Sequence, residues 1–162
     1  MNRPGVVPAT GDDDLVTAMN ALLHILDDAR FAAALRNLGG AVAVGGWLLL
    51  AEPILTRSEE PALRPGASPR ARLLARYTEV LEPAGFVHEA IAASTVVGAN
   101  PIERGQGRFG PYLRIWAWAS RWSKRGRRWA RLVGMILRAL DPVLLRTGDA
   151  PSGRLALFRR TG

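Results

Sequence analysis

A strand–helix–strand pattern near the start of the sequence constrains the fold more than any other feature. The apolar runs DLVTAM (residues 14–19) and WLLLA (residues 47–51) flank a stretch with apolar residues at helical spacing. Asp27 is expected to cap this helix, and Gly39 and Gly40 are expected to end it. Strands and helices that alternate with short links are typical of a parallel sheet. The pattern therefore predicts an α/β fold whose second strand is buried on both faces.

Periodicity and helix-breaking residues predict the elements that follow. They are, in order, a surface loop at 56–69, a helix at 70–81, a strand at 86–97, helical structure at 111–140 and a terminal strand at 153–160. Pro83 and Gly85 are expected to break the chain before the third strand, and Asp141-Pro142 is expected to end the long helical stretch.

Composition excludes several classes of protein and of site. The chain has no cysteine, which excludes disulfides, thiolate metal sites and a cysteine nucleophile, and two histidines are too few for a histidine-rich metal site. We therefore predict no metal. The longest apolar run, at 41–51, is shorter than the roughly 20 residues that cross a bilayer. The first eleven residues lack the apolar core of a signal peptide, so a cytoplasmic protein is expected.

Basic residues are concentrated in the last third of the chain. Residues 1–103 carry 8 basic and 12 acidic side chains, whereas residues 104–162 carry 14 basic and 2 acidic ones. Residues 104–140 contain ten of the basic side chains, no acidic one and four tryptophans. Such a segment suits an anionic membrane surface or single-stranded nucleic acid. The favoured interpretation is a helical cap that packs its apolar stripe on the sheet and leaves its arginines in water.

Three longer stretches place familiar motifs in a fixed order. DLVTAMNALLHILDD has a strand and a histidine turn, LRNLGGAVAVGGWLLLAEP has a Gly-Gly turn and a strand ending in Glu-Pro, and LEPAGF has an Ala-Gly-Phe turn. Over residues 12–98 this order resembles the middle of class I S-adenosylmethionine-dependent methyltransferases. Residues 153–160 resemble the terminal strand of that family more weakly.

The resemblance implies a partial Rossmann-like methyltransferase sheet, from its fourth strand onwards, with a basic helical insertion before the last strand. Residues 1–13 are then a loose lead-in and 14–162 the methyltransferase-like part, with the Trp/Arg-rich insertion at 104–142. The family's glycine-rich cofactor loop and ribose-binding acidic residue belong to the first half of its fold, and 13 residues before Asp14 are too few for a βαβ unit. We therefore expect a truncated enzyme that is inactive alone.

One motif elsewhere imitates a cofactor loop. GQGRFG, at residues 105–110, satisfies G-x-G-x-x-G, but no strand leads directly into it. The region about 20 residues further on has no carboxylate to hold a ribose. A loop in front of a helix is the favoured interpretation.

The resemblance also assigns roles to individual residues. In the branch of plant-type phenolic O-methyltransferases, a histidine at the position of His24 takes the acceptor's hydroxyl proton, and a glutamate at the position of Glu52 orients it. Ile25 and Leu26 stand where that branch has Asp-Trp, and a histidine that binds only backbone is the alternative. Met19 and Asn20 would contact the methionine part of S-adenosylmethionine.

The function implied is small-molecule or O-methyl transfer from S-adenosylmethionine to a small-molecule acceptor. The alternative is a non-catalytic module that binds an anionic surface or a protein partner through the Trp/Arg segment. Self-association is a further expectation, because a sheet that lacks its first strands exposes an edge. Nucleic acid and an anionic membrane rank below these partners.

Overall fold

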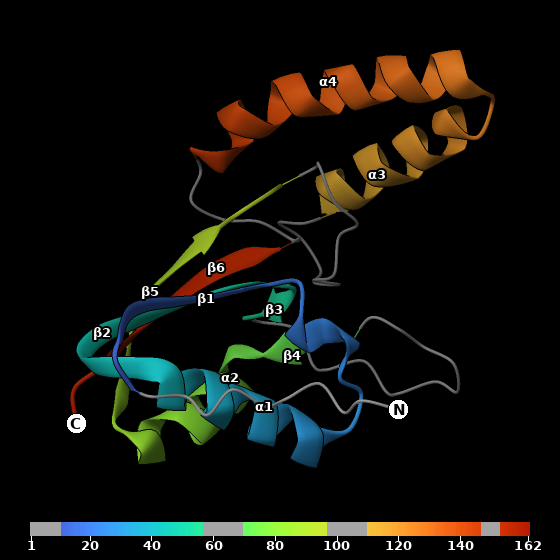
Figure 1. Ribbon diagram of the computed structural model, residues 1–162. Helices are drawn as coiled ribbons and strands as arrows, with labels where there is room; N and C mark the ends of the chain where they lie inside the picture. The colour runs from blue at the N-terminus through green and yellow to red at the C-terminus, as the bar shows by residue number, and fades with distance from the viewer. Residues whose placement is uncertain (1–10, 57–69, 97–109, 147–152) are drawn as a thin grey trace.

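The computed structural model describes residues 11–56, 70–96, 110–146 and 153–162, and within them one four-stranded sheet organises the chain. Its strands lie in the order β1 (Asp13–Met19), β2 (Val42–Glu52), β6 (Arg154–Arg160) and β5 (Phe86–Ala93). β1 and β2 are parallel, whereas β6 is antiparallel to both of its neighbours. The predicted fold class is confirmed: an α/β, Rossmann-like sheet with a helical insertion before its last strand (Figure 1).

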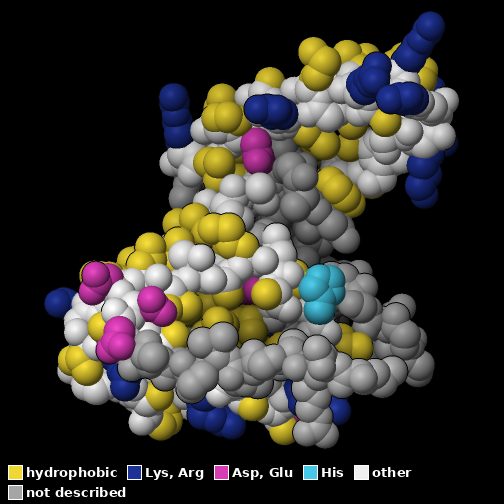
Figure 2. Space-filling view, in the orientation of Figure 1, with side chains coloured by type: hydrophobic (Ala, Val, Ile, Leu, Met, Phe, Trp, Pro, Cys, Tyr) yellow, Lys and Arg dark blue, Asp and Glu magenta, His cyan; other side chains and the backbone are white. Residues whose placement is uncertain are grey.

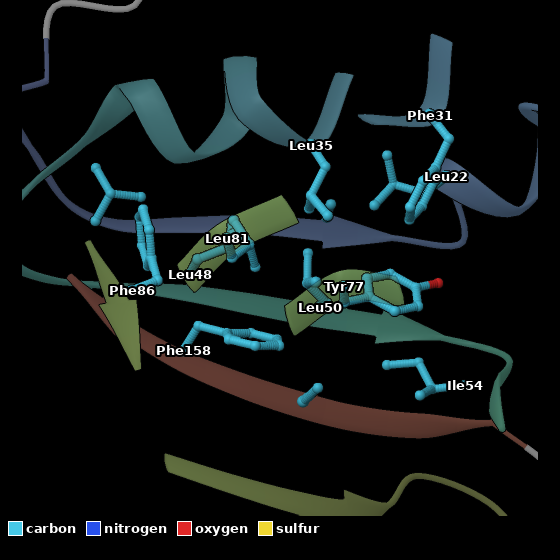
Figure 3. Close-up of a cluster of buried hydrophobic side chains, with 13 residues drawn as sticks. Leu22, Phe31, Leu35, Leu48, Leu50, Ile54, Tyr77, Leu81, Phe86 and Phe158 are labelled. Atoms are coloured by element: carbon cyan, nitrogen blue, oxygen red, sulfur yellow. The ribbon is translucent and has the colours of Figure 1, made fainter. Parts of the chain in front are cut away.

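Two helices, α1 (Asp28–Ala41) and α2 (Leu74–Leu81), cover one face of the sheet (Figure 1). Their apolar side chains meet those of the strands in one buried cluster (Figure 3). Within it the ring of Phe31 from α1 meets the ring of Tyr77 from α2 edge to face, with centroids 5.1 Å apart. Asp27 caps α1 as predicted, because its side chain accepts the backbone N–H of Arg30 at 2.8 Å.

β2 is buried on one face only, so the prediction of a strand buried on both faces is wrong. Leu48 and Leu50 are fully buried against the helices, whereas Trp47, Leu49 and Ala51 on the other face are half-buried. Phe31 and Leu35 of α1 and Tyr77 and Leu81 of α2 join Leu48 and Leu50 in one cluster, so both helices cover the same side of β2. Burial of each leucine contributes about 1.5–3 kcal/mol.

The two glycines expected to end the first helix lie inside it, and α1 continues to Ala41. A Cβ at Gly39 would lie 3.1 Å from the ring of Phe86, so this glycine lets the helix approach β5 closely. Packing against the sheet therefore outweighs the unfavourable helix propensity of two consecutive glycines.

The helix predicted at 70–81 begins later, at Leu74. Arg72 and Leu73 form a short strand, β4 (Arg72–Leu73), which pairs in parallel with β3 (Ile54–Leu55) in a second, two-stranded sheet. Arg70 is also tied by its backbone, since its N–H donates to the carbonyl of Leu23 at 2.9 Å. These long-range hydrogen bonds keep residues 70–73 extended, although the local periodicity of this segment is helical.

The helical stretch predicted at 111–140 is a hairpin of two helices, α3 (Gly110–Ser123) and α4 (Arg127–Leu145). Asp141-Pro142 does not end it. Pro142 lies inside the last turn of α4, where it cannot donate the helical N–H bond to the carbonyl of Arg138, and the helix still continues to Leu145. The predicted third strand is shorter than expected, because β5 leaves the sheet after Ala93.

The favoured packing for the hairpin is also wrong. Ala119, Val133 and Leu137 pack with Val96, just beyond β5, in a small cluster of their own, and a stripe of apolar side chains on α4 stays exposed. Residues 1–10, most of the predicted loop at 56–69 and residues 105–109 of the G-x-G-x-x-G match lie outside the described residues. Gly110, the last residue of that match, begins α3.

Candidate functional site at the carboxyl edge of β1 and β2

The two parallel strands β1 and β2 end at one edge of the sheet. Their register pairs Met19 with Ala51, and the backbone N–H of Asn20 donates to the carbonyl of Ala51 at 2.8 Å. A single turn of 3-10 helix, η1 (Leu22–His24), follows β1, and Glu52 is the last residue of β2. The structure thus brings the predicted site residues Met19, Asn20, His24 and Glu52 to the same edge, where ligands of parallel sheets bind.

The carboxylate of Glu52 is buried under the turn that carries His24. Its Oε1 accepts the backbone N–H groups of Ala21 at 2.8 Å and Leu22 at 2.9 Å, and its Oε2 accepts that of Leu23 at 3.2 Å. The Glu52 residue is 1% exposed. One side chain therefore satisfies the free amides at the start of η1, which have no partner within the turn itself.

Burial raises the pKa of the Glu52 carboxyl above its usual value, because removal from water disfavours the charged form. The three backbone N–H donors and the nearby charge of His24 oppose this rise without cancelling it. The edge therefore holds a carboxyl group that gains a proton more readily than an exposed glutamate.

The His24 side chain is exposed at this edge. Its backbone N–H donates to the carbonyl of Ala21 at 3.4 Å. Across the described contacts no hydrogen bond joins the Glu52 carboxylate to the His24 ring. Glu52 is thus connected to the imidazole through the backbone of residues 21–23, and the predicted roles of the two side chains stay predictions.

A buried arginine supports the same turn from its far side. The guanidinium of Arg72 donates to the carbonyl of Ile25 at 2.6 Å and to that of Leu26 at 3.3 Å. It also lies 4.1 Å from the centroid of the Phe31 ring. The segment after His24 is therefore held by side-chain contacts from β4, just as the segment before it is held from β2.

Asp28 connects this support to the start of α1. Its carboxylate forms ion pairs with Arg70 at 2.6 Å and with Arg72 at 3.3 Å. Partial burial opposes ionisation of Asp28, but the two guanidinium groups outweigh it and lower the pKa of the carboxyl. The site thus combines a carboxyl of raised pKa with a carboxylate of lowered pKa on either side of one turn.

Met19 and Asn20 lie in front of the turn and face solvent. Met19 is 63% exposed. Asn20 has a φ of 51°, and among the described residues it is the only one besides glycines with a positive φ. Asparagine adopts this left-handed conformation more readily than most residues, so it reverses the chain directly after β1 and leaves both side chains free to contact a ligand.

Periodicity and motif spacing missed Arg72 as part of the site. RARLLARY carries arginines at 70, 72 and 76, and nothing local distinguishes Arg72, which is buried, from the others. Its partners are the carbonyls of residues 46 to 47 positions earlier in the chain. A long-range contact of that kind leaves no periodic signal.

The described parts of the chain contain neither a cluster of metal ligands nor a membrane-spanning helix. No three His, Asp or Glu side chains there gather closely enough to hold a metal ion. None of the helices described is both long and apolar enough to cross a bilayer.

Sequence comparison finds no family model and no curated protein that matches the chain. Solved structures do resemble it. The [4+2]-cyclase SpnF aligns with 94% of this chain and 52% of its own at 18% identity and a TM-score of 0.47. The O-methyltransferase from a trans-AT PKS multienzyme of Brevibacillus brevis, in complex with S-adenosyl-L-homocysteine, aligns with 91% of this chain and 43% of its own, at 14% identity and a TM-score of 0.49.

A third solved structure is Haemonchus contortus phosphoethanolamine N-methyltransferase 2, in complex with phosphomonomethylethanolamine and S-adenosylhomocysteine. It aligns with 91% of this chain and 33% of its own at 10% identity and a TM-score of 0.42. The chain therefore spans about half, or less, of the length of these structures.

Proposed function

We propose that this chain is the acceptor-side part of a class I S-adenosylmethionine-dependent methyltransferase that acts on a hydroxyl group of a small molecule. The observation that carries the proposal is the Glu52 carboxylate, which fixes the turn of His24 at the carboxyl edge of two parallel strands. The ordered motifs of residues 12–98, whose histidine and glutamate fall at this edge, support the same activity.

His24 is the proposed general base. An exposed imidazole beside the strand ends can accept the proton of an acceptor hydroxyl as the oxygen becomes a nucleophile. S-adenosylmethionine, when bound, supplies the electrophilic methyl group. Glu52 is a positioning residue in this scheme, because it holds the backbone of residues 21–23 rather than the reacting atoms.

The residues present fit one part of the cofactor. Met19, the last residue of β1, and Asn20, the residue after it, are exposed and can contact its methionine portion. The described residues offer neither a glycine turn that follows a strand at this edge nor a second free carboxylate there for the ribose hydroxyls. We propose that the chain alone does not complete the cofactor site, and that a further strand pairs with the outer edge of β1 in the active form.

Titration calorimetry of the chain with S-adenosylmethionine tests the incomplete site. At micromolar protein we expect no measurable heat of binding, because two or three charge-assisted hydrogen bonds of about 1.5–3 kcal/mol each are missing. A one-to-one titration with micromolar affinity would show that the chain holds the cofactor by itself and would overturn this part of the proposal.

Methyl transfer tests the base. In a form of the protein that transfers methyl groups, His24→Ala should lower kcat by roughly 10²-fold or more and leave cofactor affinity nearly unchanged. His88→Ala is the matched control, because His88 lies on β5 against the ring of Phe158, away from this edge. A rate for His24→Ala within about threefold of the unmodified protein would remove His24 from the mechanism.

A further inference from the structure

The helix α4 presents a continuous apolar stripe to solvent, on the hairpin that projects from the sheet (Figures 1 and 2). The side chains of the stripe recur every three or four residues along one side of the helix and are 39–60% exposed. They are Trp129, Leu132, Ile136, Leu140 and Val143. Met135, beside them, is 70% exposed.

The stripe is not the surface that holds the hairpin together. Val133 and Leu137 of α4 are buried against Ala119 of α3 and Val96 beyond β5, on the neighbouring side of the helix. The Asp141 carboxylate also accepts the backbone N–H of Val96 at 2.9 Å, which ties α4 to the end of β5. The hairpin is therefore packed and attached without the stripe.

The hairpin carries a strong positive charge. Residues 110–146 contain nine basic side chains and one acidic one, Asp141. Five basic residues lie in or next to the turn between the helices, at 121, 124, 125, 127 and 128. Figure 2 shows Lys and Arg side chains gathered at this tip beside hydrophobic ones.

Tryptophans line the base of this charged tip. Trp122 contacts Trp118 and Trp129, with ring centroids 6.3 Å and 4.8 Å apart. The guanidinium of Arg125 lies over Trp122, 3.9 Å from its centroid. Trp129 belongs both to this aromatic cluster and to the apolar stripe, so the stripe runs without interruption into the basic tip.

We propose that the α3–α4 hairpin binds an anionic lipid surface, with α4 lying along it. The stripe would enter the boundary between headgroups and acyl chains, and the tryptophans would lie at headgroup depth. Lys124, Arg125 and Arg128 of the tip would contact lipid phosphates. Arg127, Arg131 and Arg138, opposite the stripe by helical spacing, would face water. This inference does not depend on the proposed methyl transfer.

The chemistry of the stripe favours lipid over nucleic acid. Single-stranded nucleic acid binds basic grooves through rings that stack on its bases. Leu132, Ile136, Leu140 and Val143 are aliphatic, extend along about three turns of helix and offer no stacking surface. Lipid is the partner that uses both the positive charge and this aliphatic length.

Sedimentation with vesicles tests the proposal on the full chain. We expect binding to vesicles of one part phosphatidylglycerol to three parts phosphatidylcholine, and binding at least about tenfold weaker to phosphatidylcholine alone. Substitution of three stripe residues (L132S, I136S and L140S) should weaken binding to the anionic vesicles at least about tenfold. The tip variant K124S/R125S/R128S should weaken it comparably without touching the stripe.

A matched variant controls for the loss of exposed aliphatic area. Leu15, Val44 and Val87 are 48–68% exposed on the sheet, and L15S/V44S/V87S should bind vesicles as the unmodified chain does. Far-UV circular dichroism checks that all variants keep their helices.

Three outcomes would overturn the proposal. The first is that the unmodified chain does not bind anionic vesicles. The second is that the stripe variant binds these vesicles as tightly as the unmodified chain does. The third is that the unmodified chain binds a single-stranded oligonucleotide more tightly than the vesicles, and that the stripe variant binds this oligonucleotide equally well. Self-association that depends on the stripe, without vesicle binding, would assign the surface to a second copy of the chain.

Discussion

Oε1 of Glu52 lies 2.9 Å from the backbone nitrogen of Leu22, a residue 30 positions earlier in the chain. The contact joins the end of β2 to the turn after β1, and it replaces the water that would otherwise solvate both groups. Buried N–H groups that lose their acceptor are costly. The position of residues 21–23 at this edge therefore depends on this one carboxylate.

Removal of that carboxylate should destabilise the fold. Glu52→Ala leaves the amides of residues 21–23 without their acceptor and should lower the free energy of unfolding by about 2–4 kcal/mol. Glu89→Ala is the control, because Glu89 is exposed on β5, and its effect should stay within about 0.5 kcal/mol. Urea denaturation of the unmodified chain and of the two variants measures both changes in the free energy of unfolding. Equal midpoints for the two variants would show that the turn does not need Glu52.

The raised pKa of Glu52 makes its contribution depend on pH. The folded protein holds this proton more tightly than the unfolded chain, so the contribution is fully present below the usual value of 4.5 and is lost as pH rises through the higher folded pKa. The stability advantage of the unmodified chain over Glu52→Gln should therefore shrink as pH rises above 4.5. Urea midpoints of both proteins across that range measure the gap. A gap that widens with pH would mean that the amides lower the pKa instead.

Arg72 should contribute far more to the free energy of unfolding than the neighbouring Arg76 does. Arg72→Ala removes the donors to the carbonyls of Ile25 and Leu26 and the contact with Phe31, at a cost of about 2–4 kcal/mol. Arg76 pairs with Glu79 on the exposed side of α2, so Arg76→Ala should cost about 0.5 kcal/mol or less. Thermal unfolding compares the two variants directly. Similar losses would contradict the support assigned to Arg72.

Two glycines with similar backbone angles should respond differently to alanine. Gly85 has a φ of 80°, and a Cβ there would lie 2.0 Å from the carbonyl oxygen of Gly162. Gly45 has a φ of 87°, but a Cβ there would meet nothing within 4 Å. Gly45→Ala should lower the free energy of unfolding by about 1 kcal/mol, because of the positive φ alone. Gly85→Ala should lower it by at least about 1 kcal/mol more, because its Cβ would also meet Gly162. Chemical denaturation gives both values, and equal costs would show that the end of the chain moves aside freely.

Local signals predicted most of the sheet and the first helix. The runs at 14–19, 47–51 and 153–160 form strands as predicted, although the first of them exposes most of its residues. Asp27 caps a helix because its oxygen reaches an N–H three residues on. The glycine in LEPAGF predicted a turn at Gly85, and Gly85 does adopt the left-handed conformation that glycine favours.

Contacts between distant segments account for what the sequence did not predict. Gly39 and Gly40 were expected to end a helix, but they lie inside α1, where Gly39 meets the ring of Phe86 from a distant segment. The contacts of Arg72 and the partners of the Glu52 carboxylate likewise depend on segments that meet only in the folded chain. The four predicted site residues do lie at one edge of the sheet, but the motifs did not predict the hydrogen bonds that join Glu52 to the backbone of residues 21–23.

The place of β6 in the sheet has a consequence for how the protein folds. β6 lies between β2 and β5, and its register pairs Arg154 with Glu52, across about a hundred intervening residues. During synthesis, β5 leaves the ribosome before the strand that will join it to β2 exists. Closure of so long a loop is slow compared with formation of local helices. Nascent chains that stop before β6 would therefore expose two unpaired strand edges, and such edges are where aggregation begins.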